Sequence, residues 1–253
     1  MARLSVTTRK VRTGCEGLDQ ILRGGLLEGS ATLVEGSAGT GKTTLALQFI
    51  MQGVKENEHG LIFTFEQFPE QYYDCAGELG WDLRALQQEG KIHVVFTTPE
   101  DFLEELDDPE GKIAKIISEN KTKRIVLDSI THFEKLSRDI GHLRSIETDI
   151  VNGIKREGMT AIFLKENANV LGKWDVSMNK IPFIVDTYIL LRYLEMESEI
   201  KRCLMVLKMR GSDHDKDIRE YRIEAGGLQV GEKFSGVSGI FLGTGIQARP
   251  ARK

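Results

Sequence analysis

Cysteine is scarce in this chain, and its placement argues against a disulfide scaffold. The 253 residues include three cysteines, Cys15, Cys75 and Cys203, which are far apart and match no metal-ligand spacing. Scattered thiols in odd number are typical of proteins from a reducing compartment. Apolar runs are short: none reaches the length of about 20 residues that a membrane span requires, and residues 1–5 lack the apolar core of a signal peptide. We therefore expect a cytoplasmic protein without a membrane span.

A strong excess of charge is missing as well. The chain has 34 Lys and Arg against 38 Asp and Glu, a formal net charge of −4. This balance gives no global reason to expect nucleic acid or an anionic membrane as a partner, although it leaves room for a local basic patch. No internal repeat and no low-complexity linker divides the sequence. We interpret residues 1–253 as a single domain that ends in a glycine-rich tail from about residue 231 to residue 253.

What the sequence does contain is a phosphate-binding loop. Residues 36–43 read Gly-Ser-Ala-Gly-Thr-Gly-Lys-Thr and match the pattern G-x-x-x-x-G-K-[ST] at every fixed position. In this motif backbone N–H groups surround a polyphosphate, the lysine (Lys42) adds positive charge, and the final hydroxyl (Thr43) reaches a phosphate-bound Mg²⁺. The context agrees, because a strand is predicted over 31–34 and a helix over 44–51. The alternative is a glycine turn before an ordinary helix.

Apolar runs that predict strands alternate with segments of helical periodicity. The predicted strands cover 61–65, 92–96, 124–127 and 160–164, and the predicted helices cover 71–79, 102–120 with an interruption at 109–111, and 143–156. This alternation predicts an α/β fold with a mostly parallel central sheet flanked by helices. Strand patterns over 187–194, 203–209 and 218–223 then follow in quick succession, and they predict a C-terminal antiparallel extension.

Two carboxylates end predicted strands at the edge where such folds bind ligands. Asp128 follows the run 124–127, and Glu66 follows the run 61–65. We predict that Asp128 holds Mg²⁺, directly or through water, and that Glu66 orients and deprotonates the attacking water. The predicted metal set is therefore Thr43, Asp128 and Glu66. Each carboxylate also has an alternative role as a helix cap.

Two cations near the end of another predicted strand form a further candidate site. Lys208 and Arg210 are two residues apart, so in a strand they project from the same face. Like charges repel unless an anion lies between them, and the γ-phosphate of a neighbouring subunit's nucleotide is one such anion. A solvated edge strand protected by charge is the alternative, and the residues by themselves do not choose between the two.

Longer segments resemble the KaiC-like ATPases of the RecA superfamily. The resemblance covers roughly residues 10–230, corresponds to one repeat of that family, and is carried by segments 17–29, 64–67, 69–71, 80–83, 124–131 and 208–220. It implies a RecA-like P-loop NTPase core that binds ATP and Mg²⁺ between adjacent subunits of a homohexameric ring. It also implies the catalytic residues Glu66, Lys42, Lys208 and Arg210. The implied nucleotide contacts are Gly36, Ala38, Gly39, Thr40, Gly41, Lys42, Thr43, Thr44, Arg202, Lys208, Met209, Arg210, Ser212, His214 and Lys216.

Two departures from the family pattern limit what the resemblance implies. The second of two adjacent glutamates is Gln67 here, a change that can alter the pKa of Glu66 and the hydrolysis rate. The serine and threonine acceptors of the family's phosphorylatable repeat are Pro182 and Phe183 here, and nothing in the sequence singles out the nearby Ser177. We therefore expect no autokinase activity of the clock type at that pair.

Three functions remain open at this point. The first is a slow, ring-forming ATPase that regulates an unknown protein partner. The second is a DNA-dependent, recombinase-like ATPase, but the corresponding region around 166–180 offers only Lys165, Lys173, Trp174 and Lys180, so nucleic acid is not favoured. The third is an ATP-gated scaffold with little hydrolysis. The acidic run 101–110 fits a solvated helix and turn or a partner-docking face equally well.

Overall fold

The computed structural model describes residues 9–108, 110–120, 122–168, 184–196, 198–235, 237–238 and 246–247. Its centre is a nine-stranded sheet in the order β11-β10-β9-β8-β3-β7-β6-β4-β5. The parallel strands are β3 (Ala31–Gly36), β4 (His59–Thr64), β5 (Ile92–Phe96), β6 (Thr122–Asp128), β7 (Thr160–Glu166) and β8 (Thr187–Met196). Their near-continuous apolar sequences suit strands that are buried on both faces. The prediction of a mostly parallel sheet is confirmed.

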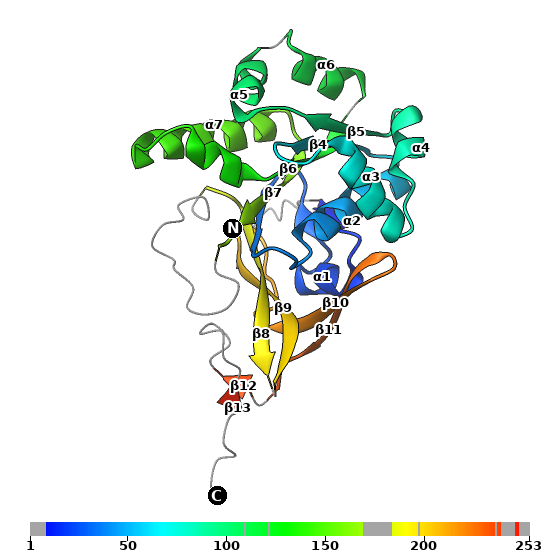
Figure 1. The fold of residues 1–253 in the computed structure, drawn as a ribbon, viewed down its shortest axis with the longest axis vertical. Helices are drawn as coiled ribbons and strands as arrows, with labels where there is room; N and C mark the ends of the chain where they lie inside the picture. The colour runs from blue at the N-terminus through cyan, green and yellow to red at the C-terminus, as the bar shows by residue number, and fades with distance from the viewer. Residues whose placement is uncertain are drawn as a thin grey trace, which may run out of the picture.

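The antiparallel extension lies beside β8. It consists of β9 (Glu199–Met209), β10 (Arg219–Glu224) and β11 (Gly227–Lys233), and Figure 1 shows these strands leading away from the green helices. The extension was predicted, but β11 was not, because its sequence is rich in glycine and charge. Two small sheets pair β1 (Lys10–Val11) with β2 (Leu26–Leu27) and β12 (Val237–Ser238) with β13 (Ile246–Gln247).

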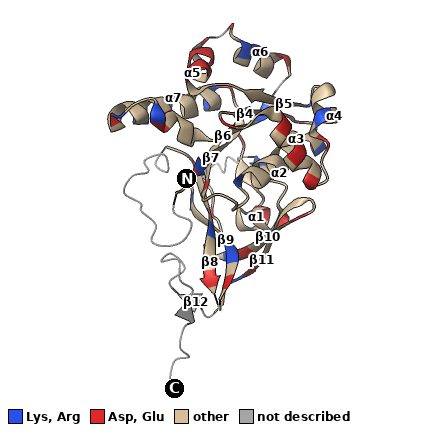
Figure 2. Cartoon of the chain, viewed as in Figure 1, with Lys and Arg blue, Asp and Glu red and all other residues tan. Residues whose placement is uncertain are grey.

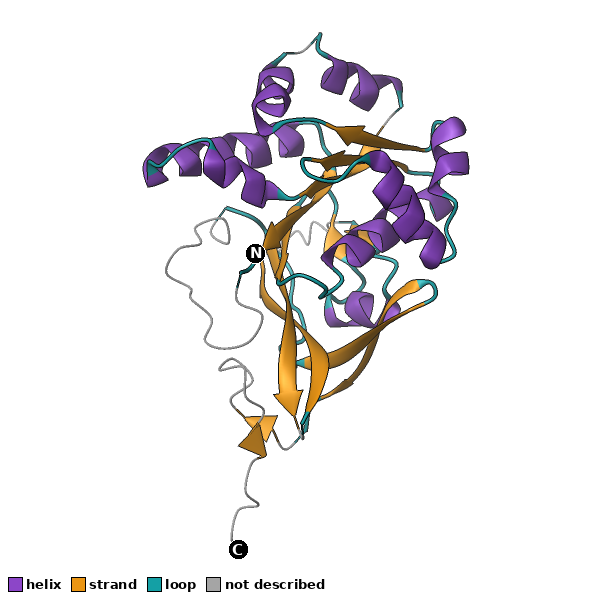
Figure 3. Cartoon of the chain, viewed as in Figure 1, coloured by secondary structure: helices purple, strands orange, loops and turns teal. Residues whose placement is uncertain are grey.

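Helices cover both faces of the sheet (Figure 3). One face packs α1 (Glu16–Ile21), α2 (Lys42–Lys55), α3 (Pro69–Glu78) and α4 (Leu83–Gln88) against a core that includes Val34, Ile62 and Val126. The other packs α5 (Pro99–Asp107), α6 (Lys112–Glu119), α7 (Ile140–Arg156) and the 3₁₀ helix η1 (Ile130–Lys135) against a core that includes Leu61, Phe63 and Ile125. Neighbouring residues of one strand alternate between the two cores, as the pleat requires.

A buried arginine lies at the end of the sheet opposite the phosphate loop. The Arg124 side chain on β6 is fully buried and donates to Glu56, to Glu58 and to the carbonyl oxygens of Arg12 and Phe49, at 2.6–2.8 Å. Its guanidinium also lies 4.8 Å from the centre of the Phe49 ring. A buried guanidinium is tolerated because its donors are satisfied and its charge is paired.

Several predictions from the sequence fall outside the described residues. These are Lys173, Trp174, Ser177, Lys180, Pro182, Phe183, residues 1–5 and most of the C-terminal tail. Lys165 is described: it is buried on β7 and paired with Glu134, which removes it from any solvent-facing basic patch. Figure 2 shows Lys and Arg interspersed with Asp and Glu over the described elements. Among the helices that the structure describes, none is long and apolar enough to cross a membrane.

Candidate functional site

The phosphate loop and the two predicted carboxylates meet at the carboxyl edge of the parallel sheet. The phosphate loop follows β3, Asp128 ends β6, and Glu66 comes two residues after β4. The strands are in register at this edge, since Thr64 pairs with Asp128 and the backbone N–H of Phe65 donates to the Asp128 carbonyl at 3.1 Å. The loop and both carboxylates therefore open on the crevice where ligands of open α/β sheets bind.

The phosphate loop is held by hydrogen bonds from Lys42 and Thr40 to one of its own carbonyl oxygens. Lys42 Nζ donates to the Ser37 carbonyl at 3.1 Å, and the Thr40 hydroxyl donates to the same oxygen at 2.8 Å. Ala38 and Gly39 are exposed at the tip, whereas Thr40, Lys42 and Thr44 are buried. Gly41 has a φ of 87°, and a Cβ there would come within 2.6 Å of the Ile223 side chain. Glycine is required at this position both for conformation and for space.

Burial shifts the pKa of the two central charged groups toward their neutral forms. Burial lowers the pKa of Lys42, and the nearby carboxylates of Glu166 and Asp128 oppose this. Burial raises the pKa of Asp128, and hydrogen bonds from Tyr72 and Thr43 oppose it, together with the charge of Lys42. Displaced pKa values in opposite directions within one crevice are characteristic of functional sites.

The donors at this edge fit a magnesium–nucleotide complex. Thr43 Oγ1 donates to Asp128 Oδ2 at 2.8 Å, so the hydroxyl and the carboxylate that the motif assigns to Mg²⁺ are in contact. Ser129 Oγ, directly after Asp128, is buried without a hydrogen-bond partner among the described residues. Those residues include no cluster of three or more His, Cys, Asp or Glu side chains for a metal. Thr43 and Asp128 are a sufficient protein set for Mg²⁺, which takes one or two protein ligands and completes its shell with phosphate and water.

Two side chains that sequence reasoning missed support the carboxylates. The Tyr72 hydroxyl on α3 donates to Asp128 Oδ2, and His132 Nε2 on η1 lies 3.2 Å from Glu66 Oε2. Tyr72 sits in the apolar stripe of its helix, and His132 matches no metal spacing, so no local pattern distinguished them from structural residues. Only the folded chain brings them to the site.

Lys208 and Arg210 lie at the opposite end of the sheet from the phosphate loop. Lys208 pairs with Tyr188 near the start of β8, and β8 begins beside the start of β3. Tyr188 lies opposite Leu33 of β3, so three residues of β3 separate the level of Lys208 from Gly36 at the start of the loop, about 10 Å along the strand. Lys208 Nζ donates to the Val185 carbonyl at 2.6 Å, and Arg210, which is exposed, donates its backbone N–H to the Asp186 carbonyl at 2.9 Å. Burial, reinforced by the charge of Arg210, lowers the pKa of Lys208.

The remaining predicted contacts divide between the two ends. Ser212 lies with Lys208 at the far end and accepts a hydrogen bond of 2.8 Å from Lys10, while His214 and Lys216 follow in the same loop. The Met209 side chain is buried in the core. Arg202 differs from this group: it donates to the Gly39 carbonyl of its own phosphate loop at 3.4 Å and lies over the Tyr193 ring.

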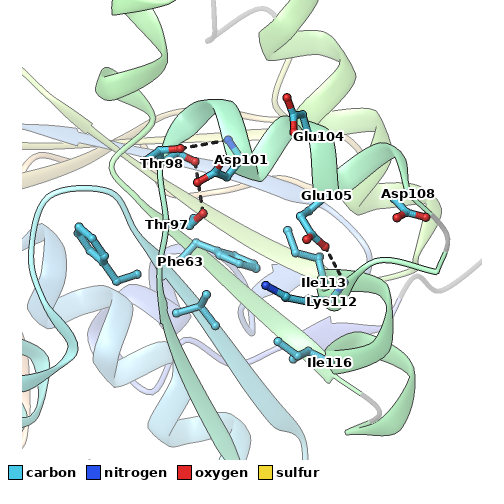
Figure 4. A pocket seen from close by; sticks show the side chains of 12 residues that line it. Phe63, Thr97, Thr98, Asp101, Glu104, Glu105, Asp108, Lys112, Ile113 and Ile116 are labelled. Atoms are coloured by element: carbon cyan, nitrogen blue, oxygen red, sulfur yellow. Dashed lines mark hydrogen bonds between the residues drawn. The ribbon is translucent and has the colours of Figure 1, made fainter.

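A cavity of about 670 Å³ lies apart from this site (Figure 4). It opens between the end of β5 and helices α5 and α6, with Phe63, Ile113 and Ile116 among its apolar lining residues. Four carboxylates and one lysine line it as well: Asp101, Glu104, Glu105, Asp108 and Lys112. Phosphate binding needs the opposite charge, and the phosphate loop contributes nothing to this cavity.

The comparisons with known proteins agree with the geometry. A family model described as "ATPase: KaiC" matches residues 11–235, which include the phosphate loop, both carboxylates and the Lys208–Lys216 segment. The chain belongs to the KaiC ATPase family. A strand, a phosphate loop and a helix at the centre of a mostly parallel sheet are what a RecA-like member of this family requires, and the predicted resemblance is confirmed.

Curated relatives in the KaiC family are similar over nearly the whole chain. "Circadian clock protein KaiC3" of Synechocystis sp. is 37% identical over 235 residues, which are 93% of this chain and 46% of that protein. "Circadian clock oscillator protein KaiC" of Parathermosynechococcus lividus is 32% identical over 237 residues, 93% of this chain and 43% of the relative. The same-named protein of Acaryochloris marina is 32% identical, with 44% of its length covered. The chain thus spans about half the length of these relatives, which is consistent with one repeat.

Proposed function

We propose that this protein is a Mg²⁺-dependent ATPase that works as a homohexameric ring, with each ATP site shared by two adjacent subunits. The observation that carries the proposal is the separation of the site into two halves. The phosphate loop lies at the carboxyl end of β3, and Lys208 and Arg210 lie near its start. Within one chain these two halves lie at different levels of the sheet, so we assign the second half to a head-to-tail neighbour in a closed ring.

The chain's own residues supply most of the chemistry on the phosphate-loop side. Backbone N–H groups of the loop and the Lys42 ammonium bind the phosphates. When Mg²⁺ is bound, Thr43 and Asp128 hold it, and it supplies charge neutralisation at the phosphate oxygens. Glu66 orients the attacking water and accepts its proton.

The neighbouring subunit completes the site. Its Arg210 and Lys208 stabilise the negative charge that develops on the transferred phosphoryl group. The exposure of Arg210 leaves its side chain accessible to a neighbour. Hydrolysis then requires assembly, so ring formation controls the ATPase activity. In this proposal turnover is slow, and the ring regulates a protein partner. The free thiols of Cys15, Cys75 and Cys203 fit a cytoplasmic location.

The first test combines phosphate release with mass by light scattering. We expect Mg²⁺-ATP to assemble 28.4 kDa subunits into rings, and we expect the Lys42→Ala variant, which lacks the phosphate-binding ammonium, to lose ATP-dependent assembly. Arg210→Ala should keep the rings but reduce turnover about a thousandfold or more, as the loss of a trans arginine does in related chemistry.

The matched control is Lys201→Ala. Lys201 is a cation on β9, the strand that Arg210 directly follows, and its Nζ lies 3.9 Å from Glu220. The substitution should leave turnover unchanged. Assembled Arg210→Ala rings that hydrolyse ATP at the wild-type rate would contradict a shared site. A monomer in the presence of Mg²⁺-ATP would contradict the ring.

A further inference from the structure

We propose that His132 is a positioning residue for Glu66. Its imidazole N–H holds the Glu66 carboxylate in the orientation from which Glu66 accepts the proton of the attacking water. The inference rests on the proposed function, in which Glu66 is the base. Its geometric core is the 3.2 Å separation of His132 Nε2 and Glu66 Oε2, within reach of a charge-assisted hydrogen bond.

Glu66 has little else to hold it. The residue follows the last strand residue of β4 by two positions, and its side chain is 66% exposed. A glutamate with three free torsions samples many rotamers in such a place. Among the hydrogen bonds and ion pairs of the described residues, the contact with His132 is the one that its carboxylate makes. A catalytic base must be placed to within about half an ångström to be effective, so the contact with His132 would supply the positioning that Glu66 needs.

His132, in contrast, is fixed. Its side chain is only 15% exposed. The preceding residue, Thr131, accepts a hydrogen bond of 2.9 Å from the backbone N–H of Glu166. Two residues later Glu134 pairs with the buried Lys165. Both anchors are on β7, so η1 is tied to the sheet on each side of His132.

The residues next to Glu66 and His132 also pack against each other. Phe65 directly precedes Glu66, and Phe133 directly follows His132. Their rings pack edge to face with centroids 4.9 Å apart and an interplanar angle of 80°, and Phe102 packs against both. Edge-to-face packing of this kind contributes stability beyond the area it buries. The Glu66–His132 contact therefore lies next to a rigid aromatic cluster.

The proposed contact needs no change of protonation. A neutral imidazole has one N–H, and a carboxylate that accepts from Nε2 selects the tautomer with the proton on Nε2. A glutamine at position 132 can offer its side-chain N–H at a similar reach, whereas an alanine offers none. These two replacements separate the loss of the hydrogen bond from the loss of the ring.

The experiment is steady-state ATP hydrolysis by assembled rings of wild type, His132→Ala and His132→Gln. We expect His132→Ala to lower kcat about tenfold, a part of the 10²–10⁴ that a positioned base contributes, while the KM for ATP changes less than twofold. His132→Gln should recover most of kcat. On a Glu66→Gln background, His132→Ala should have no further effect, because the group that it positions is gone. The control is His142→Ala, since His142 is exposed on α7, and it should behave as wild type.

Failure of the positioning role and failure of the proposed function give different results. Wild-type hydrolysis that Glu66→Gln abolishes but His132→Ala leaves unchanged overturns the positioning role and leaves the ATPase intact. Equal losses in the Ala and Gln variants, or losses that multiply with that of Glu66→Gln, also overturn it. No hydrolysis by wild-type rings overturns both proposals. A thermal unfolding midpoint equal to that of wild type shows that a lower kcat does not come from unfolding.

Discussion

Replacing Arg124 with methionine should destabilise the protein strongly, although the two side chains are similar in length. The guanidinium is 0% exposed, while the Glu56 and Glu58 side chains that it pairs with are 28% and 12% exposed. The substitution removes the Arg124 donors from Glu56 Oε2, Glu58 Oε2 and the carbonyl oxygens of Arg12 and Phe49. Glu56 keeps its hydrogen bond from Gln52, and Glu58 keeps its ion pair with the exposed Arg9. Removing one partner of a buried ionic cluster costs about 3–5 kcal/mol, because the remaining charge stays desolvated.

The assay is urea or thermal unfolding followed by circular dichroism. For a chain of this size, a loss of about 3–5 kcal/mol lowers Tm by roughly 6–20 °C. The matched control is Arg84→Met, since Arg84 is exposed and its guanidinium lies 4.6 Å over the Tyr73 ring, a contact worth about 0.5–1 kcal/mol. Adding Glu56→Gln and Glu58→Gln to Arg124→Met should restore part of the loss, because it removes the two carboxylate charges that Arg124 neutralised. An Arg124→Met variant no less stable than Arg84→Met would refute the reasoning.

Two further predictions concern stability. Gly53→Ala should destabilise the protein by about 1–3 kcal/mol, because the new Cβ on α2 would lie 2.6 Å from Cδ of the buried Arg124. Gly77→Ala in α3 meets nothing within 4 Å and should stabilise the protein by up to about 1 kcal/mol. Urea unfolding of both variants measures the two changes. Burial raises the pKa of Glu147 from its ordinary 4.5 to about 7, against the charge of Lys165. The folded state therefore keeps this proton between about pH 4.5 and 7, and stability falls as pH rises through that window. Glu147→Gln should then be the more stable form at pH 8, by about 1 kcal/mol after solvent screening, with the advantage shrinking toward pH 5; equal stabilities of the two forms at pH 8 would count against this.

The sequence was sufficient where a local pattern determines the structure. The phosphate loop, the strand before it and the helix after it follow from residues 31–51 alone. Asp128 and Glu66 were located because each ends an apolar run, and parallel strands bring their carboxyl ends to one edge. The hydrophobic alternation likewise predicted the sheet and its antiparallel extension, which β8, β9 and β10 realise.

What the sequence could not reveal depends on contacts between distant segments. Arg124 lies 66 residues from Glu58, and His132 lies just as far from Glu66, so no window along the chain pairs them. The β11 strand was missed because its pairing with β10, rather than apolar composition, makes it a strand. The position of Arg202 also depends on strand pairing. The register of β9 against β8 places Arg202 beside the phosphate loop of its own chain, at the end of β9 opposite Lys208.

The most direct test of the shared site is complementation between two inactive variants. Arg210→Ala and Glu66→Gln subunits, co-expressed with different tags and purified through both, form mixed rings. An Arg210→Ala subunit keeps a working phosphate loop and Glu66, and a Glu66→Gln neighbour supplies it with Arg210. With random placement around the ring, roughly one site in four is then complete, and the account predicts hydrolysis at up to about a quarter of the wild-type rate. Mixed rings no more active than either variant alone would contradict an active site shared between subunits.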